Sequence, residues 1–143
     1  SMQLQISRII ANLKIADKVK LLGSFEYSSM PQIHNIADVF CLPSVPTKIW
    51  AEQFGYSIVE AMACGKPVVS TSTGSIPEIV KDHTTGILVK PNDPSGLESA
   101  IEELILDKHE RDTFGRKGRG WVLQKFEANM IAAQLAKIYY KFI

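Results

Sequence analysis

The chain of 143 residues has an ordinary globular composition, with 45% hydrophobic and 22% charged residues, which argues against a disordered, collagen-like or coiled-coil protein. Its 16 basic and 15 acidic residues give a net charge of +1. The chain therefore has no overall positive field to hold a polyanion, and nucleic acid is not an expected partner. No apolar run approaches the roughly 20 residues that a membrane-spanning helix needs.

Apolar spacing predicts helices that alternate with short strands. The strands are apolar throughout and are flanked by helices, which is typical of a parallel sheet covered on both faces. We therefore predict an α/β domain with a parallel sheet of about four strands. In chain order, the predicted elements are a helix over residues 3–15, a strand over 19–22, a helix over 29–37, a strand over 39–42, a helix over 55–63, a strand over 67–71, a helix over 75–81, a strand over 86–89, helices that begin at 93 and 107, and a final helix over 127–142.

Polar residues mark the starts of several of these helices. Ser29–Gln32, Ser75–Glu78 and Asp107–Glu110 have the spacing of a capping box, in which the two side chains bond to backbone N–H groups at the helix start. Asp93 is followed by Pro94, the pattern of a capping aspartate with proline in the first turn.

The most informative segment lies between the second predicted strand and the helix after it. Ligands of parallel sheets bind beyond the carboxyl ends of the strands. The candidate ligand-binding segments are therefore residues 23–28, 43–55 and 70–75, which follow predicted strands. Gly55 opens a helix directly after a strand and its loop. The first N–H groups of that helix lack partners within it and could bind phosphate.

Two glutamates flank this helix start. Glu60 lies among apolar helix residues, where a carboxylate is costly unless it is paired or hydrogen-bonded, and ribose hydroxyls could supply such bonds. Glu52 lies in the preceding loop. A nucleoside diphosphate sugar matches this layout, with the sugar near Glu52, the diphosphate at Gly55 and the ribose near Glu60. The alternative is that Glu60 faces solvent and that Glu52 is an ordinary loop charge.

The segment from Glu52 to Val69 resembles the E-x7-E signature of the retaining GT-B glycosyltransferases, the glycosyl transferases group 1 family. The resemblance covers nearly the whole chain. Its flanking segments are Val19–Gly23, Ala37–Ser44, Thr73–Glu78 (with Ser75 in place of the second glycine of the family's G-G-x-x-E segment) and Thr85–Asp93.

The resemblance implies a Rossmann-like C-terminal domain that binds a UDP-, GDP- or ADP-sugar as donor. Glu60 would bond to the ribose hydroxyls, and Glu52 would contact the sugar near the reacting carbon, as the candidate catalytic residue. Enzymes of this family retain the anomeric configuration through a front-face displacement, and neither a metal nor a cofactor is expected. The remaining implied donor-binding residues are Gly23 at the base pocket, Ser44 at the end of the preceding strand, and Phe54, Gly55, Tyr56 and Ser57 around the diphosphate.

The resemblance also implies that residues 1–143 form part of the C-terminal domain, without its first two strands and without the acceptor domain. We expect the edges at 19–22 and 39–42 either to pair directly or to pair with a second copy. The expected protein is a cytoplasmic glycosyltransferase of the hexosyltransferase type with an unknown acceptor, of which this chain alone is inactive. The alternative is a non-catalytic nucleotide-sugar-binding or structural module.

Other polar residues carry weaker signals. Cys41 and Cys64 have apolar neighbours, as buried reduced thiols of cytoplasmic proteins do. Glu78 either caps its helix with Ser75 or contacts the donor. Surface or packing roles are expected for His34, His83 and His109. A solvated helix face, with contact to a membrane surface as the alternative, is expected for Lys108, Arg111, Arg116, Lys117 and Arg119.

Overall fold

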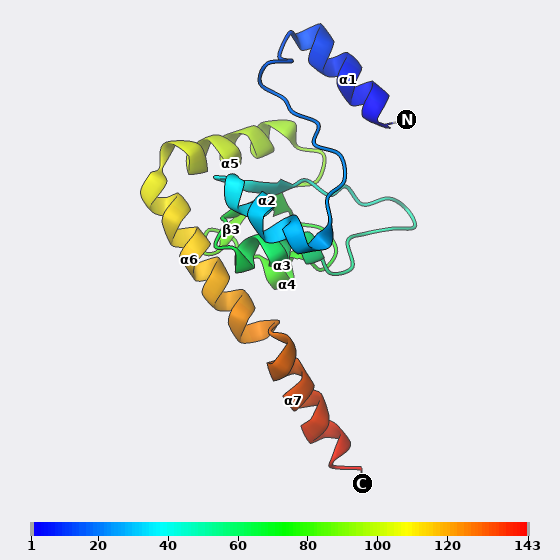
Figure 1. The fold of residues 1–143 in the computed structure, drawn as a ribbon, viewed down its shortest axis with the longest axis vertical. Coiled ribbons are helices and arrows are strands. Elements are labelled where there is room, and N and C mark those ends of the chain that lie inside the picture. Colours follow the sequence, from blue (N-terminus) through cyan, green and yellow to red (C-terminus); the bar gives the residue numbers. More distant parts are fainter. Residues whose placement is uncertain (1, 143) are drawn as a thin grey trace.

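The computed structural model describes residues 2–142. Its centre is a parallel sheet of three strands in the order β1-β2-β3 (Figure 1). Phe40 and Gly86 are the register partners of Val68 on either side of the central strand. The predicted α/β class with a parallel sheet is confirmed. The strands are β1 (Phe40–Leu42), β2 (Val68–Thr71) and β3 (Gly86–Val89).

Helices cover this sheet and extend beyond it at both ends of the chain. Figure 1 shows α1 set apart from the sheet and α7 projecting from the end of α6. Neither of these two terminal helices has a buried residue. The helices are α1 (Met2–Leu13), the 3₁₀ turn η1 (Tyr27–Ser29), α2 (Met30–Ile36), α3 (Tyr56–Ala63), α4 (Ile76–Ile79), α5 (Pro94–Leu106), α6 (Lys108–Lys125) and α7 (Ala128–Tyr139).

The two faces of the sheet carry separate apolar clusters, because successive side chains of a strand point to opposite faces. Val68 belongs to the cluster that α3, α4 and the end of α6 cover, together with Ile58 and Ile76. Val69 belongs to the cluster under α5 and the start of α6, together with Leu104. The continuous apolar runs of the strands therefore reflect burial on both sides.

The predicted strand over residues 19–22 is not formed, and the sheet has three strands instead of about four. Residues 19–26 have no regular secondary structure. Leu21 and Leu22 are 49% and 59% exposed, and no strand lies beside them in the described part of the chain. A strand needs a neighbour for its backbone N–H and C=O groups. Direct pairing of 19–22 with 39–42 was therefore the wrong expectation, while pairing with a second copy stays a prediction.

Only some of the predicted helix caps form. The Asp93 carboxylate accepts from the Gly96 N–H at 2.9 Å, and Asp107 accepts from the Glu110 N–H at 2.9 Å. The side chains of Ser29 and Ser75 make no cap hydrogen bond. Both serines have helical backbone angles, whereas a capping side chain reaches the first turn from an extended backbone. The prediction that Glu78 caps its helix together with Ser75 is thus not confirmed.

Helix α6 packs against the end of helix α3, the helix that follows the loop of residues 43–55. The Arg119 guanidinium donates to the carbonyl of Ala63 at the end of α3, at 2.6 Å. Two glycines of α6 lie directly against this region: a Cβ at Gly115 would overlap the carbonyl oxygen of Gly65, and one at Gly118 would lie 3.3 Å from Met62. The backbones of α3 and α6 therefore come close together.

Candidate functional site

The carboxylate of Glu52 lies at the start of α3. Its Oε1 accepts from the Gly55 N–H at 3.1 Å, and its Oε2 faces the Ser44 hydroxyl at 3.5 Å. A carboxylate at this place is favoured by the partial positive charge of a helix N-terminus. The structure thus brings together three of the residues that the sequence pointed to, Ser44, Glu52 and Gly55.

The backbone of Glu52 is fixed by the turn that follows β2. The Ser75 N–H donates to the Glu52 carbonyl at 3.0 Å, and the Ser75 hydroxyl lies 3.4 Å from the same oxygen. Gly74 packs so close to this carbonyl that a Cβ there would overlap it. Sequence reasoning missed this contact, although Gly74 and Ser75 lie in the segment that resembles the family's G-G-x-x-E pattern.

The N-terminus of α3 keeps unpaired donors. Gly55 is the N-cap, with φ of +74°, and its own N–H is taken by Glu52. The N–H groups of Tyr56 and Ser57 make no hydrogen bond to any group among residues 2–142. The side chains of Phe54 and Tyr56 pack against each other, with ring centroids 4.8 Å apart, and Phe54 also contacts Phe126. These contacts tie the loop before α3 to the end of α6.

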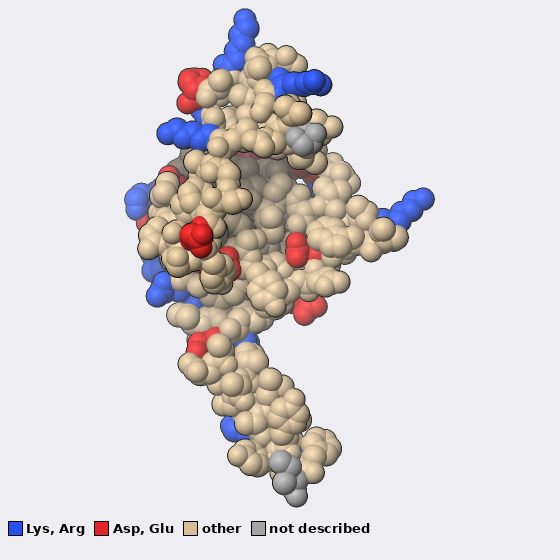
Figure 2. Space-filling view, turned by 45° about the vertical axis from the view of Figure 1, so that its right-hand side comes forward, with Lys and Arg blue, Asp and Glu red and all other residues tan. Residues whose placement is uncertain are grey.

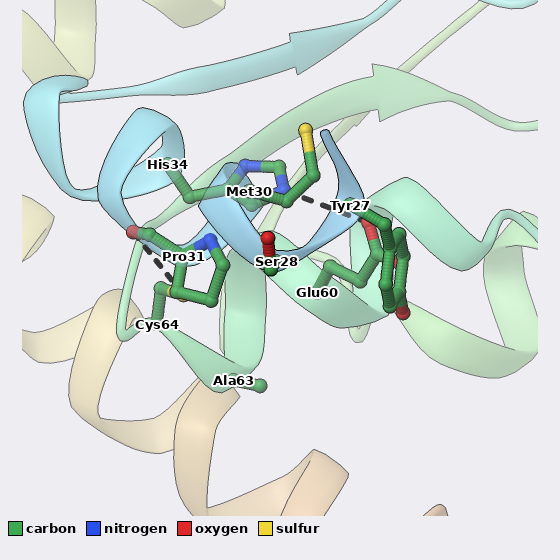
Figure 3. Close-up of a pocket in the computed structure, with 8 residues that line it drawn as sticks. All are labelled: Tyr27, Ser28, Met30, Pro31, His34, Glu60, Ala63 and Cys64. Carbon is green, nitrogen blue, oxygen red and sulfur yellow. Dashed lines mark hydrogen bonds and ion pairs between the residues drawn. The ribbon is translucent and has the colours of Figure 1, made fainter. Parts of the chain in front are cut away.

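Glu60 lies on α3 and contacts two residues from the segment before β1 (Figure 3). The Tyr27 hydroxyl donates to Glu60 Oε1 at 2.9 Å, and His34 Nε2 lies 3.6 Å from Glu60 Oε2. The Glu60 side chain is 28% exposed, so it is partly shielded by these neighbours and partly open to solvent. The pKa of Tyr27 is raised above its ordinary value, mainly by the hydrogen bond to Glu60 and to a smaller extent by the negative charge of Glu60.

These contacts form one wall of a pocket between α2 and α3, with a volume of about 270 Å³. Most of its surface is apolar, as is usual for sites that bind small molecules. Gly23, which the resemblance assigned to the base pocket, is exposed and does not line it. The lining residues, all drawn in Figure 3, are Tyr27, Ser28, Met30, Pro31, His34, Glu60, Ala63 and Cys64.

Tyr27 and His34 were missed as site residues by sequence reasoning, which expected a surface or packing role for His34. His34 is indeed buried, and its ring packs edge-on against Phe40, but it also faces Glu60. One feature of the sequence could have indicated His34 as a site residue: it lies on the helix that follows the predicted base-pocket segment.

Basic residues of α6 are partly engaged by the protein itself. Lys108 pairs with Asp112 at 2.6 Å, and the Arg111 guanidinium donates to the carbonyls of Leu104 and Ile105. Figure 2 shows a face with a hollow below the N-terminal helix, acidic side chains beside the hollow, and lysine and arginine side chains toward the periphery. The basic residues therefore do not gather at this hollow.

Among residues 2–142, no group of three or more histidine, cysteine, aspartate or glutamate side chains is arranged to hold a metal ion. None of the helices in that part of the chain has both the length and the apolar character needed to cross a bilayer.

The chain is similar in sequence to known glycosyltransferases. Residues 1–121 match the family described as Glycosyl transferases group 1. The GDP-mannose-dependent alpha-(1-6)-phosphatidylinositol monomannoside mannosyltransferase of Mycolicibacterium smegmatis is 31% identical over 135 residues, which are 93% of this chain and 35% of that protein. The chain thus spans about a third of the length of the curated relatives that it matches first.

Solved structures of other proteins superpose closely on this chain. Sucrose-phosphate synthase from Thermosynechococcus elongatus gives a TM-score of 0.88 at 29% identity, over 99% of this chain and 34% of that one. HepE from Anabaena, in complex with UDP-glucose, gives 0.85 at 30% identity, over 96% of this chain and 36% of that one. The chain belongs to the glycosyl transferases group 1 family and has the fold of a GT-B C-terminal domain.

Proposed function

We propose that the chain is the donor-binding part of a retaining glycosyltransferase, which transfers a sugar from a nucleoside diphosphate sugar to an acceptor. The observation that carries the proposal is Glu60, a half-buried carboxylate on the wall of an apolar pocket. Two relatives support it: HepE was solved with UDP-glucose, and the Mycolicibacterium enzyme is named for GDP-mannose.

In this proposal the nucleoside occupies the pocket between α2 and α3. Ribose hydroxyls donate to the Glu60 carboxylate, which has two acceptor oxygens. The Tyr27 hydroxyl holds Oε1 in this structure, and the side chain of Tyr27 is exposed, so a ribose hydroxyl can replace it. The base would lie against the apolar wall formed by Met30, Pro31 and Ala63. Gly23 does not line this pocket, and its assignment to the base pocket stays a prediction from the family resemblance.

The diphosphate would lie at the N-terminus of α3. The unpaired N–H groups of Tyr56 and Ser57 and the Ser57 hydroxyl are the donors proposed for it, next to Phe54 and Gly55. Helix N-termini bind phosphates because several backbone donors and the positive end of the helix dipole converge there. The Gly55 N–H already holds a carboxylate oxygen, which supports an affinity of this helix end for oxyanions.

The transferred sugar would lie beside Glu52 and Ser44. In a retaining front-face reaction, the acceptor oxygen bonds to the anomeric carbon on the face from which the diphosphate leaves. The bond between that carbon and the diphosphate oxygen breaks, and the acceptor proton passes to the departing oxygen. The N–H groups of α3 would stabilise the charge that develops on the diphosphate, while Glu52 would contact the sugar near the reacting carbon.

The wider setting of the chain also belongs to this proposal. We expect a hexose as the sugar, and catalysis that requires an acceptor-binding part beyond this chain, which spans about a third of its relatives. Cys41 and Cys64 are free thiols, as is usual in the reducing cytoplasm, so we place the protein there, soluble or peripheral to a membrane.

Calorimetric titration with UDP-, GDP- and ADP-sugars tests the proposal. We expect one of the three to bind, and Glu60→Ala to abolish the binding. Glu98→Ala, which removes an exposed carboxylate on α5, is the matched control and should bind as the wild type does. Absence of binding to all three nucleotide sugars would contradict the proposal and leave the alternative of a structural module.

A further inference from the structure

His34 contains a buried polar atom without a hydrogen-bond partner. The side chain is 5% exposed, and its Nε2 finds no donor or acceptor among the described residues. Such atoms are rare in folded proteins because an unpaired buried polar group destabilises the native state. His34 is one of the residues that line the pocket between α2 and α3 (Figure 3), and a role of its Nε2 at that pocket explains why the unpaired atom is tolerated.

The surroundings of His34 hold its ring in one orientation. The ring packs edge-on against Phe40 of β1, with centroids 5.5 Å apart and planes at 65°. This contact anchors the imidazole to the sheet, while Nε2 lies on the side of Glu60, 3.6 Å from Oε2. The distance is slightly longer than a hydrogen bond, so a small shift of the Glu60 side chain is enough to form one.

The two oxygens of Glu60 therefore have different neighbours. Oε1 accepts from the hydroxyl of Tyr27, a residue that is 76% exposed. Oε2 faces His34, which is buried and fixed by packing. A ligand hydroxyl can thus replace Tyr27 at Oε1, whereas the partner of Oε2 is fixed in place.

We propose that His34 is a positioning residue for donor binding: its Nε2–H donates to Glu60 Oε2 and thereby presents Oε1 to a ribose hydroxyl of the nucleotide. The inference rests on the proposed function, since it assigns the ribose to Glu60. It adds a residue of the pocket wall that acts on the nucleotide through the orientation of the Glu60 carboxylate.

The test compares four proteins in calorimetric titrations with UDP, GDP and ADP. His34→Leu removes the donor and approximately keeps the volume, whereas His34→Gln keeps a terminal N–H donor. We expect the leucine variant to bind the preferred nucleotide roughly tenfold more weakly, the size expected from a hydrogen bond to a charged group. The glutamine variant should recover most of that loss. His109→Leu, which removes an exposed histidine from α6, is the matched control and should bind as the wild type does.

A double-mutant cycle separates positioning from a purely structural role. If His34 acts through the Glu60 carboxylate, His34→Leu lowers the affinity less in the Glu60→Gln background than in the wild type. An equal loss in both backgrounds, or a glutamine variant as weak as the leucine variant, would overturn the inference. If the leucine variant does not fold, the glutamine variant and His34→Asn, which places its amide short of Glu60, provide the same comparison.

The outcomes also distinguish this inference from the proposed function. Binding that depends on Glu60 but not on His34 overturns the positioning role alone. A wild-type protein that binds none of the three nucleotides overturns both.

Discussion

The backbone of Gly74 lies directly against the carbonyl oxygen of Glu52, with no room for a Cβ between them. The contact joins the turn after β2 to the loop before α3, two segments that are separate in the sequence. It is reinforced by the hydrogen bonds from Ser75 to the same carbonyl. The position of Glu52 therefore depends on the main chain of a neighbouring loop as well as on its own.

Gly74→Ala is expected to destabilise the protein and to displace Glu52. Gly74 has φ of +55°, a left-handed conformation that costs a non-glycine residue about 1–2 kcal/mol, and the new Cβ would in addition overlap the Glu52 carbonyl. Gly65→Ala is the matched control, because Gly65 also has a positive φ but has open space around its Cβ position. Urea unfolding should show a larger loss of stability for Gly74→Ala, and equal losses would contradict the close contact.

The Tyr27 hydroxyl is expected to titrate above the ordinary tyrosine pKa of 10.0, because its hydrogen bond to Glu60 and the charge of Glu60 raise its pKa. Glu60→Gln should return the titration of Tyr27 toward the ordinary value. The raised pKa in the folded state means that the hydrogen bond adds stability fully below the unfolded pKa. That contribution is lost as the pH rises through the folded value.

Carbon-13 NMR of the tyrosine Cζ resonances measures this titration, and Tyr27→Phe identifies the signal of Tyr27. An unchanged midpoint in Glu60→Gln would show that the two side chains do not interact in solution. The experiment needs no ligand, so it tests the geometry of the site independently of its proposed function.

Tyr27→Phe is expected to tighten nucleotide binding about two- to fivefold. The Tyr27 hydroxyl occupies the Glu60 oxygen that we assign to ribose, so its removal abolishes a competing hydrogen bond, while the ring remains beside the pocket. Tyr139→Phe removes an exposed hydroxyl from α7 and serves as the control. Weaker binding by Tyr27→Phe in calorimetry would mean that the hydroxyl contacts the nucleotide directly.

Association of this chain with a second copy remains a prediction from the open edge of the sheet. β1 pairs with β2 on one side only among the described residues, and unpaired edges promote association. Light scattering over a range of concentrations should show a mass above that of one chain. A single-chain mass at every concentration would contradict the prediction.

The strands show what the sequence pattern could and could not predict. The runs that became β1, β2 and β3 are apolar because both faces of the sheet are covered, and the prediction placed all of them within about a residue. Residues 19–22 have a similar apolar run but form no strand. Strand formation depends on a partner elsewhere in the fold, which a local pattern does not report.

The site was only partly predicted, because some of its contacts join segments that are distant in the sequence. The helix start at Gly55 and the two glutamates around it follow from local sequence, and Ser44 and Glu52 do lie together. The partners of Glu60 come from a distant segment, Tyr27 being 33 residues away. Whether Ser29 or Ser75 caps its helix depends on the backbone angles of the serine itself, which the residue type alone did not fix.

The glycines of α6 have a consequence for the site helix. At Gly115 and Gly118 the spacing between α6 and the α3 region is set by main-chain atoms and by Met62, and the Arg119 bond to Ala63 holds the end of α3. Neighbouring surface side chains can therefore vary without altering the depth at which α3 sits. The position of Glu60 and of the N–H groups of α3 relative to α6 is thus set largely by main-chain contacts, so substitutions on the outer face of α6 are expected to leave the polar groups of the site in place.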